Sequence, residues 1–363
     1  MRFNVLLWGL LLSISIPNLN ASTIFDLIAS ETEVREVSLE LPMDSILAKT
    51  NDKQAATISF TDDTGLAQRW SLNVGVRGKF RRRICTLPPL RLDFKKSDLE
   101  EAGLARHDKL KLVVPCLDSE DGEILLLREY IAYQVYERLT PYHFRTQLLA
   151  LTLVDSEGVH ADRTVYAFLL EDTDEMAERM GGEEIDGLVS LNSREWNREA
   201  ETIHSMGQYL LGNHDFSLTM VRNLKQVRLR TNGLLIPVAY DFDFSQLVGA
   251  PYLTLNSSVG QESFTERVFL GFQAEDEIIA RSLGRVEAQR REILRYVRTF
   301  ELLSYEEREV LVNRLLSGFN QLRRVYRNKD RTDRGPLYDQ LRGKHVDILP
   351  IGELPENYGL SSR

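Results

Sequence analysis

Cysteine is scarce in this sequence: Cys85 and Cys116 are its only two, which excludes a scaffold held together by many disulfides. A thiolate metal site would need more cysteines, and a redox-active pair would usually lie closer together in sequence. One disulfide is the interpretation that remains for a chain in an oxidising compartment. Both cysteines lie beside strand-like segments, so we expect the bridge to join neighbouring strands.

Long apolar runs are missing beyond the first residues, which predicts that the mature chain has no transmembrane segment. The single apolar run, Val5–Ile16, follows a positively charged start and ends at Pro17, with a small residue, Ala21, at a plausible cleavage point. This layout is typical of a signal peptide spanning 1–21, with an uncleaved anchor helix as the alternative. The sequence therefore predicts a periplasmic or secreted protein.

An excess of positive charge is absent as well, because 45 lysines and arginines face 54 acidic residues for a net charge of −9. This balance argues against nucleic acid as a general partner. Basic residues cluster locally at Arg77, Lys79 and 81–83. Such a patch on an acidic protein often meets an anion, and a solvated loop is an equally good interpretation.

The pattern of apolar residues predicts strands first and helices later. Period-two alternation indicates strands between residues 33 and 114, and again near 147–154 and 164–170. Helical spacing begins at Leu127, returns before Gly212, and dominates 275–326. We therefore divide the chain into the signal peptide, a β-rich part, a mostly helical part and an extended tail: 1–21, 22–125, 126–330 and 331–363.

Acidic and amide side chains gather around a predicted hairpin. Asp215 follows a helix that Gly212 is placed to end, and Asn223 comes a short loop later. Asn232-Gly233 is a strong hairpin turn, and the return strand ends at Asp241 and Asp243. The hairpin brings these carboxylates back towards Asp215 and Asn223. Such an oxygen-rich set suits a hard divalent cation such as magnesium.

The order of an Asp, an Asn, a hairpin and a second Asp is also that of protein kinases. With several further motifs it resembles the CotH kinase-like proteins, over roughly Trp70 to Gly271. The residues that carry the resemblance are Arg77-Gly78, Leu90–Lys95, Leu127-Arg128-Glu129, the loop ending at Asn223, and Tyr240-Asp241-Phe242-Asp243.

The resemblance implies an α+β, atypical protein-kinase-like bilobal fold, with a β-rich N-terminal lobe and a mostly helical C-terminal lobe. It also implies ATP, Mg²⁺ or Mn²⁺, and phosphoryl transfer to a protein or cell-envelope acceptor. Asp215 would be the catalytic base. Asn223 and Asp241 would hold the metal, and Asp243 would be a second ligand or an orienting group.

The same resemblance implies that Glu129 pairs with a cation that binds the nucleotide phosphates. The family usually has a lysine just before the strand at 90–94, where this chain has Pro88-Pro89. Arg91, Lys79 and Lys95 are the candidates to replace it, although arginine and lysine are not interchangeable at such a site.

Other interpretations of these residues stay open. Asp215 alone could cap a turn, and Asn223 could be a turn residue. The family lysine and a G-x-G-x-x-G loop are both missing, which favours a catalytically silent scaffold that binds an envelope protein or an anionic polymer. A transferase that uses another activated phosphate donor is a third hypothesis. No Ser-His-Asp arrangement or nucleophile elbow supports a hydrolase.

Overall fold

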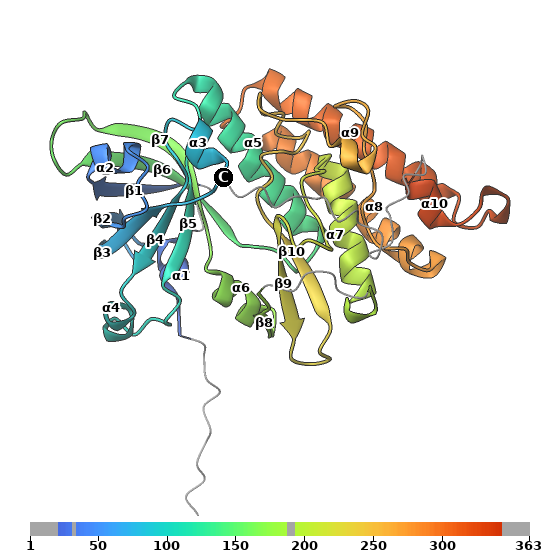
Figure 1. Cartoon of the computed structure of the whole chain (residues 1–363), viewed down its shortest axis with the longest axis horizontal. Helices are drawn as coiled ribbons and strands as arrows, with labels where there is room; N and C mark the ends of the chain where they lie inside the picture. Colours follow the sequence, from blue (N-terminus) through green and yellow to red (C-terminus); the bar gives the residue numbers. More distant parts are fainter. Residues whose placement is uncertain (1–20, 31–33, 187–192, 343–363) are drawn as a thin grey trace, which may run out of the picture.

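The computed structural model describes residues 21–30, 34–186 and 193–342. The predicted signal peptide, except Ala21, lies outside the described residues, as does 343–363 of the predicted tail. The described chain combines strands and helices, which confirms the predicted α+β content. Strands gather on the left of Figure 1 and long helices on the right.

The strands on the left form a closed barrel in the order β1–β2–β3–β4–β5–β7–β6. Neighbouring strands are antiparallel, except that β1 and β6 pair in parallel and close the barrel. Apolar side chains alternate along each strand, so that one face fills the barrel interior. The bounds are β1 (Val34–Leu41), β2 (Gln54–Thr61), β3 (Ala67–Val76), β4 (Leu90–Phe94), β5 (Lys109–Val113), β6 (Thr146–Asp155) and β7 (Arg163–Leu170).

The prediction of a bilobal protein-kinase fold is wrong, because this sheet closes on itself. The predicted boundary at residue 125 assigned β6 and β7 to the C-terminal part. In the structure both strands join the barrel, where β6 pairs with β1 and β7 pairs with β5. Alternation predicts each of these strands correctly, but it carries no information about pairing between segments far apart in the chain.

The long helices pack together beside the barrel and share a separate apolar core. Helix α5 contacts β6 and β7 on one side and α7 and α8 on the other, so it links the barrel to the helical part. Pro141 follows the end of α5, and Gly212 ends α7 with a positive φ of 65°, as predicted. The bounds are α5 (Glu120–Leu139), α7 (Arg198–Leu211), α8 (Asp276–Thr299) and α9 (Tyr305–Arg327).

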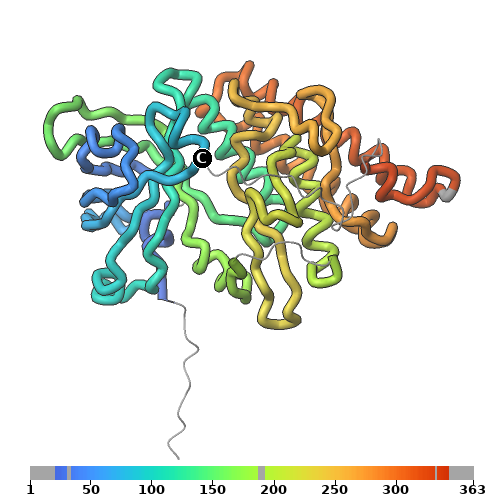
Figure 2. The backbone as a smooth tube through the Cα atoms, in the orientation of Figure 1, coloured from blue at the N-terminus to red at the C-terminus, as the bar shows by residue number. Residues whose placement is uncertain are grey.

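A second sheet, in the order β10–β9–β8, lies at the lower centre of Figure 1, where β10 packs against α7. The predicted hairpin is confirmed, because β9 and β10 pair antiparallel on either side of Asn232-Gly233. Figure 2 traces this hairpin away from the centre of the molecule and back. The strand bounds are β8 (Gly182–Glu184), β9 (Leu224–Leu229) and β10 (Leu235–Ala239).

Short helices complete the described chain. They are α1 (Ile24–Ile28), α2 (Met43–Leu47), α3 (Arg81–Ile84), α4 (Lys96–Glu101), α6 (Thr173–Arg179) and α10 (Leu337–Arg342), with 3-10 turns at Ser193–Glu195, Ser257–Val259 and Thr332–Arg334. None of the helices in the described ranges combines the length and the apolar character needed to cross a membrane.

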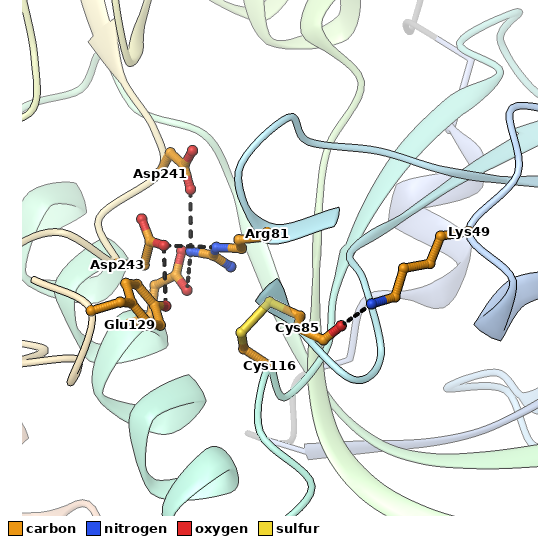
Figure 3. Close-up of a disulfide and its surroundings, with 8 residues drawn as sticks. Lys49, Arg81, Cys85, Cys116, Glu129, Asp241 and Asp243 are labelled. Carbon is orange, nitrogen blue, oxygen red and sulfur yellow. Dashed lines mark hydrogen bonds and ion pairs between the residues drawn. A yellow bond between two sulfur atoms is a disulfide. The ribbon is translucent and has the colours of Figure 1, made fainter. Parts of the chain in front are cut away.

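Cys85 and Cys116 form the predicted disulfide, with their Cα atoms 4.4 Å apart (Figure 3). Cys85 directly follows α3, and its backbone N–H donates to the carbonyl of Arg81. Cys116 lies a few residues before α5. The disulfide therefore ties α3 to the start of the helix that links the barrel to the helical part.

Candidate functional site

A cavity of about 640 Å³ lies where the barrel, helix α5 and the segments around the second sheet meet. The barrel side contributes the 77–81 segment and β5, and α5 contributes Glu129 and Tyr133. The opposite wall comes from the loop before β9 and the segment after β10. Several of the predicted site residues line this cavity: Lys79, Glu129, Asp215, Asn223, Asp241 and Asp243.

The loop after α7 places Asp215 beside Asn223. Gly212 turns the chain, and the buried side chain of Asn213 accepts a hydrogen bond from the backbone N–H of Asp215 at 3.0 Å. Asn223, which has a positive φ of 53°, donates its amide N–H to the backbone carbonyl of Asp215 at 2.6 Å and to its carboxylate at 2.9 Å. The eight-residue spacing therefore closes into a direct contact.

The environment of Asp215 favours its protonated form. Burial raises the pKa of Asp215, as does the charge of Asp243, whereas Arg222 and the hydrogen bond from Asn223 lower it. The net direction is upward. A carboxylate with a raised pKa is a stronger base once it is ionised, which suits a role in accepting a proton.

The segment after β10 turns sharply at Asp241, which adopts a positive φ of 65°. Its backbone N–H donates to the hydroxyl of Tyr133 at 2.8 Å, and the fully buried ring of Phe242 packs edge-on against the Tyr133 ring. These contacts fix the backbone. With the backbone held in this way, the side chain of Asp241 is 43% exposed, whereas that of Asp243 points into the interior and is only 4% exposed.

Arg81 is the residue that joins the acidic side chains, as Figure 3 shows. Its guanidinium pairs with Glu129 at 2.8 Å, with Asp243 at 2.8 Å and with Asp241 at 3.2 Å. Burial alone would lower the pKa of Arg81, but the charges of Asp243, Glu129 and Asp241 raise it well above its ordinary value. The arginine is therefore a permanent cation at this point.

Arg81 is thus the cation that pairs with Glu129, and the sequence did not identify it. Arg81 belongs to the basic cluster of 81–83, but local sequence cannot tell which member of such a run points inward. Arg82 instead donates to the backbone of Lys49, and Arg83 is exposed. Only Arg81 of this run is buried.

Lys111 on β5 is a second cation of the cavity that sequence reasoning missed. Its ammonium donates to the hydroxyl of Thr173 at 2.7 Å and lies 4.6 Å from the centre of the Phe144 ring. Burial, together with the charges of Arg77 and Lys225, lowers the pKa of Lys111 to about 7. The alternation of Leu110 and Leu112 into the barrel was the available signal, because it directs the residue between them outward.

The other predicted cations are placed differently. Lys79 and its neighbour Arg77 line the cavity. Arg91 does not line it, and its guanidinium instead pairs with Asp93 at 3.0 Å. Lys95 is exposed at the start of α4 and also lies off the cavity.

The donors available to a metal ion are limited. In the described part of the chain, no group of three or more His, Cys, Asp or Glu side chains is arranged to hold a metal. Asp243 is engaged by Arg81 and by the hydroxyl of Tyr252 at 3.2 Å. The half-exposed carboxylate of Asp241, which Arg81 contacts at 3.2 Å, is the other acidic donor. The amide oxygen of Asn223 lies on the same cavity, and its nitrogen is committed to Asp215. Mg²⁺ commonly takes one or two protein ligands plus substrate phosphates, so this small set fits it.

A smaller cavity of about 220 Å³ adjoins the first and shares Asp215, Arg222 and Phe244 with it. Polar side chains make up much of its wall, including His214 and Asn256. Burial lowers the pKa of His214 to about 4, so the ring is neutral near pH 7. Asp215 therefore lies at the boundary between two cavities.

Comparison with known proteins gives little further guidance. No family model and no curated protein matches the chain. Among solved structures, the chain is similar to the crystal structure of a Helicobacter pylori proinflammatory kinase, CtkA, with 10% sequence identity and a TM-score of 0.40 over 67% of this chain and 95% of that one. So low a TM-score assigns neither fold nor activity, and the resemblance to the CotH kinase-like proteins stays a prediction.

Proposed function

We propose that the chain is a kinase-like phosphotransferase that uses ATP and a divalent cation to phosphorylate a hydroxyl of a protein or cell-envelope acceptor. The observation that carries the proposal is the pairing of Asp215 with Asn223 at the edge of the cavity that also holds Asp241 and Lys111. A base, amide and carboxylate oxygens, and cations lie around one space, which is the set that phosphoryl transfer requires.

The basic side of the cavity would bind the phosphates of the donor. Lys111, Arg77 and Lys79 line one wall, and none of them has a carboxylate within ion-pair distance among the described residues. Arg81 is different, because Glu129 and Asp243 already neutralise it. We therefore assign phosphate binding to the first three and the positioning of the acidic side chains to Arg81.

Asp241 and Asn223 would hold the divalent cation, which when bound would neutralise charge on the phosphate oxygens. Asp215 would orient the acceptor hydroxyl, which enters from the smaller cavity, and would take its proton. In that step the acceptor oxygen forms a bond to the γ-phosphorus, and the bond from that phosphorus to the bridging oxygen breaks. The proton moves to the Asp215 carboxylate, and the electron pair leaves with the nucleoside diphosphate.

A catalytically silent binding protein is the second candidate, and one observation favours it. Arg81 occupies both Asp241 and Asp243, so the carboxylates expected to hold a metal already have a cation beside them. In that case the cavity would bind an anionic partner without chemistry.

Transfer of labelled γ-phosphate separates the two candidates. The mature chain is incubated with γ-labelled ATP, Mg²⁺ or Mn²⁺, and a cell-envelope fraction, beside Asp215→Asn and a control, Asp330→Asn, at an exposed position. Asparagine keeps the shape of the loop but cannot take a proton. We expect Asp215→Asn to lose about 100-fold or more in rate and the control to match wild type. Equal rates in all three, or no labelling by wild type, would reject the catalytic proposal.

A further inference from the structure

A third cavity, of about 580 Å³, lies between helix α9 and the segment that follows β10. It shares no lining residue with the cavity of Asp241. It meets the smaller cavity beside Asp215 only through Gln246 and Leu253. Among the described residues that line it, Arg267 and Arg314 are the charged ones.

Both arginines donate to neutral groups of the described chain. Arg267 donates to the backbone carbonyl of Arg314 at 2.8 Å and to the hydroxyl of Ser317 at 3.3 Å. Arg314 donates to the carbonyl of Leu247 at 2.9 Å. Among the described residues neither guanidinium lies within ion-pair distance of a carboxylate, and the buried Nε of Arg267 has no hydrogen-bond partner at all.

Other inward-facing arginines of the molecule are compensated. Arg35 pairs with Asp63, Arg128 with Glu307, and Arg145 with three acidic residues: Asp26, Glu171 and Glu175. A buried charge is costly unless it is paired, which is why such pairing is the norm. Arg267 and Arg314 are partly exposed, and no carboxylate of the described chain neutralises them, so their charge is available to an anion that enters the cavity.

The electrostatics agree with the geometry. Burial lowers the pKa of Arg267, Tyr209 raises it and the charge of Arg314 lowers it, with a net downward shift. Burial likewise lowers the pKa of Arg314, with an added contribution from Arg128 that Glu307 partly offsets. Carboxylates raise the pKa of Arg145 instead. Both guanidinium groups stay charged at neutral pH, because arginine does not lose its proton in proteins.

The backbone is shaped around one of these groups. Gly249 has a positive φ of 67°, and a Cβ atom there would lie 2.7 Å from a terminal nitrogen of Arg314. The absent side chain lets the guanidinium lie directly against the main chain. This close approach and the hydrogen bond to the carbonyl of Leu247 position the Arg314 guanidinium at the cavity wall.

We propose that this cavity binds a phosphate monoester. A dianionic phosphate matches two fixed guanidinium groups in charge, and arginine forks bind phosphate oxygens in pairs of hydrogen bonds. Thr265 and Ser317 add hydroxyl groups to the wall, while the exposed ring of Phe264 offers an apolar surface for the organic part of the ester. The site is independent of the proposed transfer of phosphate at Asp215.

Calorimetric titration with phenyl phosphate at low salt tests this site. Wild type is compared with Arg267→Gln, Arg314→Gln and Arg323→Gln, a control that removes the same charge from an exposed position on α9. Each of the first two variants should weaken binding by about tenfold or more, because each loses charged hydrogen bonds to the phosphate. The control should bind within about twofold of wild type.

The two arginine variants themselves distinguish the cavities, because Arg267 and Arg314 do not line the cavity of Asp241. Phenyl phosphate bound only in that other cavity would bind equally to wild type and to both variants. Melting temperatures without ligand identify any variant that fails to fold, and Arg314→Lys then replaces Arg314→Gln as a milder change that loses the fork. Binding that is equal in wild type and both arginine variants, or absent from wild type at millimolar concentration, would overturn the proposal.

Discussion

Replacing Arg81 by glutamine should destabilise the protein more than most single substitutions. Its guanidinium is the shared partner of Glu129, Asp241 and Asp243, and the first and last of these side chains are only 5% and 4% exposed. Arg81→Gln leaves both of these buried carboxylates without their cation. Removing one partner of a buried ion pair costs about 3–5 kcal/mol, and we expect a loss in the upper part of that range near pH 8.

The loss should depend on pH, and its sign follows from Glu129. Burial raises the pKa of Glu129, Arg81 lowers it, and the charges of Asp243 and Asp241 raise it. Without Arg81 the pKa of Glu129 rises further. The folded variant then holds a proton that the unfolded chain releases above its ordinary pKa of 4.5, so stability falls as pH rises from there. The difference from wild type is therefore smaller at pH 5 than at pH 8.

Urea unfolding at both pH values measures these effects. Arg83→Gln is the matched control, since Arg83 is an exposed arginine on the same short helix. The control should unfold within about 0.5 kcal/mol of wild type. If Arg81→Gln lies within about 1 kcal/mol of the control at pH 8, or if its loss grows towards acid pH, the assigned role of Arg81 is refuted.

Three further changes test other parts of the structure. Replacing both Cys85 and Cys116 by serine should lower the free energy of unfolding in urea by about 4 kcal/mol, because the disulfide restricts the unfolded chain across a separation of 31 residues. An unchanged midpoint of urea unfolding would contradict this. Burial raises the pKa of Glu201 to about 7, so the free energy of unfolding of wild type should fall by up to about 3 kcal/mol as pH rises from about 4.5 to 7. Glu201→Gln should lack this fall, and the same dependence of stability on pH in both proteins would argue against the prediction. Gly212→Ala places a methyl group 2.7 Å from the Gln246 side chain at a φ of 65°. The melting temperature of this variant should be several degrees below that of wild type. The melting temperature of the control Gly158→Ala should fall less, because the space around Gly158 is open.

Much of the local structure could be predicted from the sequence. The alternation of Val37, Leu39 and Leu41 predicts a strand with one buried face, and β1 has that face inside the barrel. Asn232-Gly233 predicts a hairpin, and Gly212 predicts the end of a helix. Each of these signals lies within a few residues of what it predicts, which is why it succeeds.

The closure of the barrel could not be predicted in the same way. It depends on the parallel pairing of Val34–Leu41 with Thr146–Asp155, and a strand's sequence does not specify a distant partner. The resemblance predicted a bilobal protein-kinase fold instead, and the closed barrel shows that this prediction was wrong. The motifs thus did not predict which strands pair with one another in space.

The candidate site shows the same division. The order of Asp215, Asn223 and Asp241 around a hairpin correctly indicated that these residues converge on one cavity. The cation that pairs with Glu129 was not identified, because Arg81 comes from a short helix whose orientation depends on the Cys85–Cys116 disulfide and on tertiary contacts. Arg81 and Arg83 lie in the same run of arginines, yet Arg81 is buried and Arg83 is exposed.

A nucleotide site at Asp241 can be tested by the melting temperature of the protein with ATP, with and without Mg²⁺, beside that of Asp241→Asn. Asparagine tolerates the positive φ of 65° at this position, so the variant removes the charge and keeps the backbone. We predict a Mg²⁺-dependent stabilisation of about 2.7 kcal/mol at an ATP concentration of about 100 Kd, and its loss in Asp241→Asn. No shift with any nucleotide and metal, or an equal shift in the variant, would contradict a working nucleotide site at Asp241.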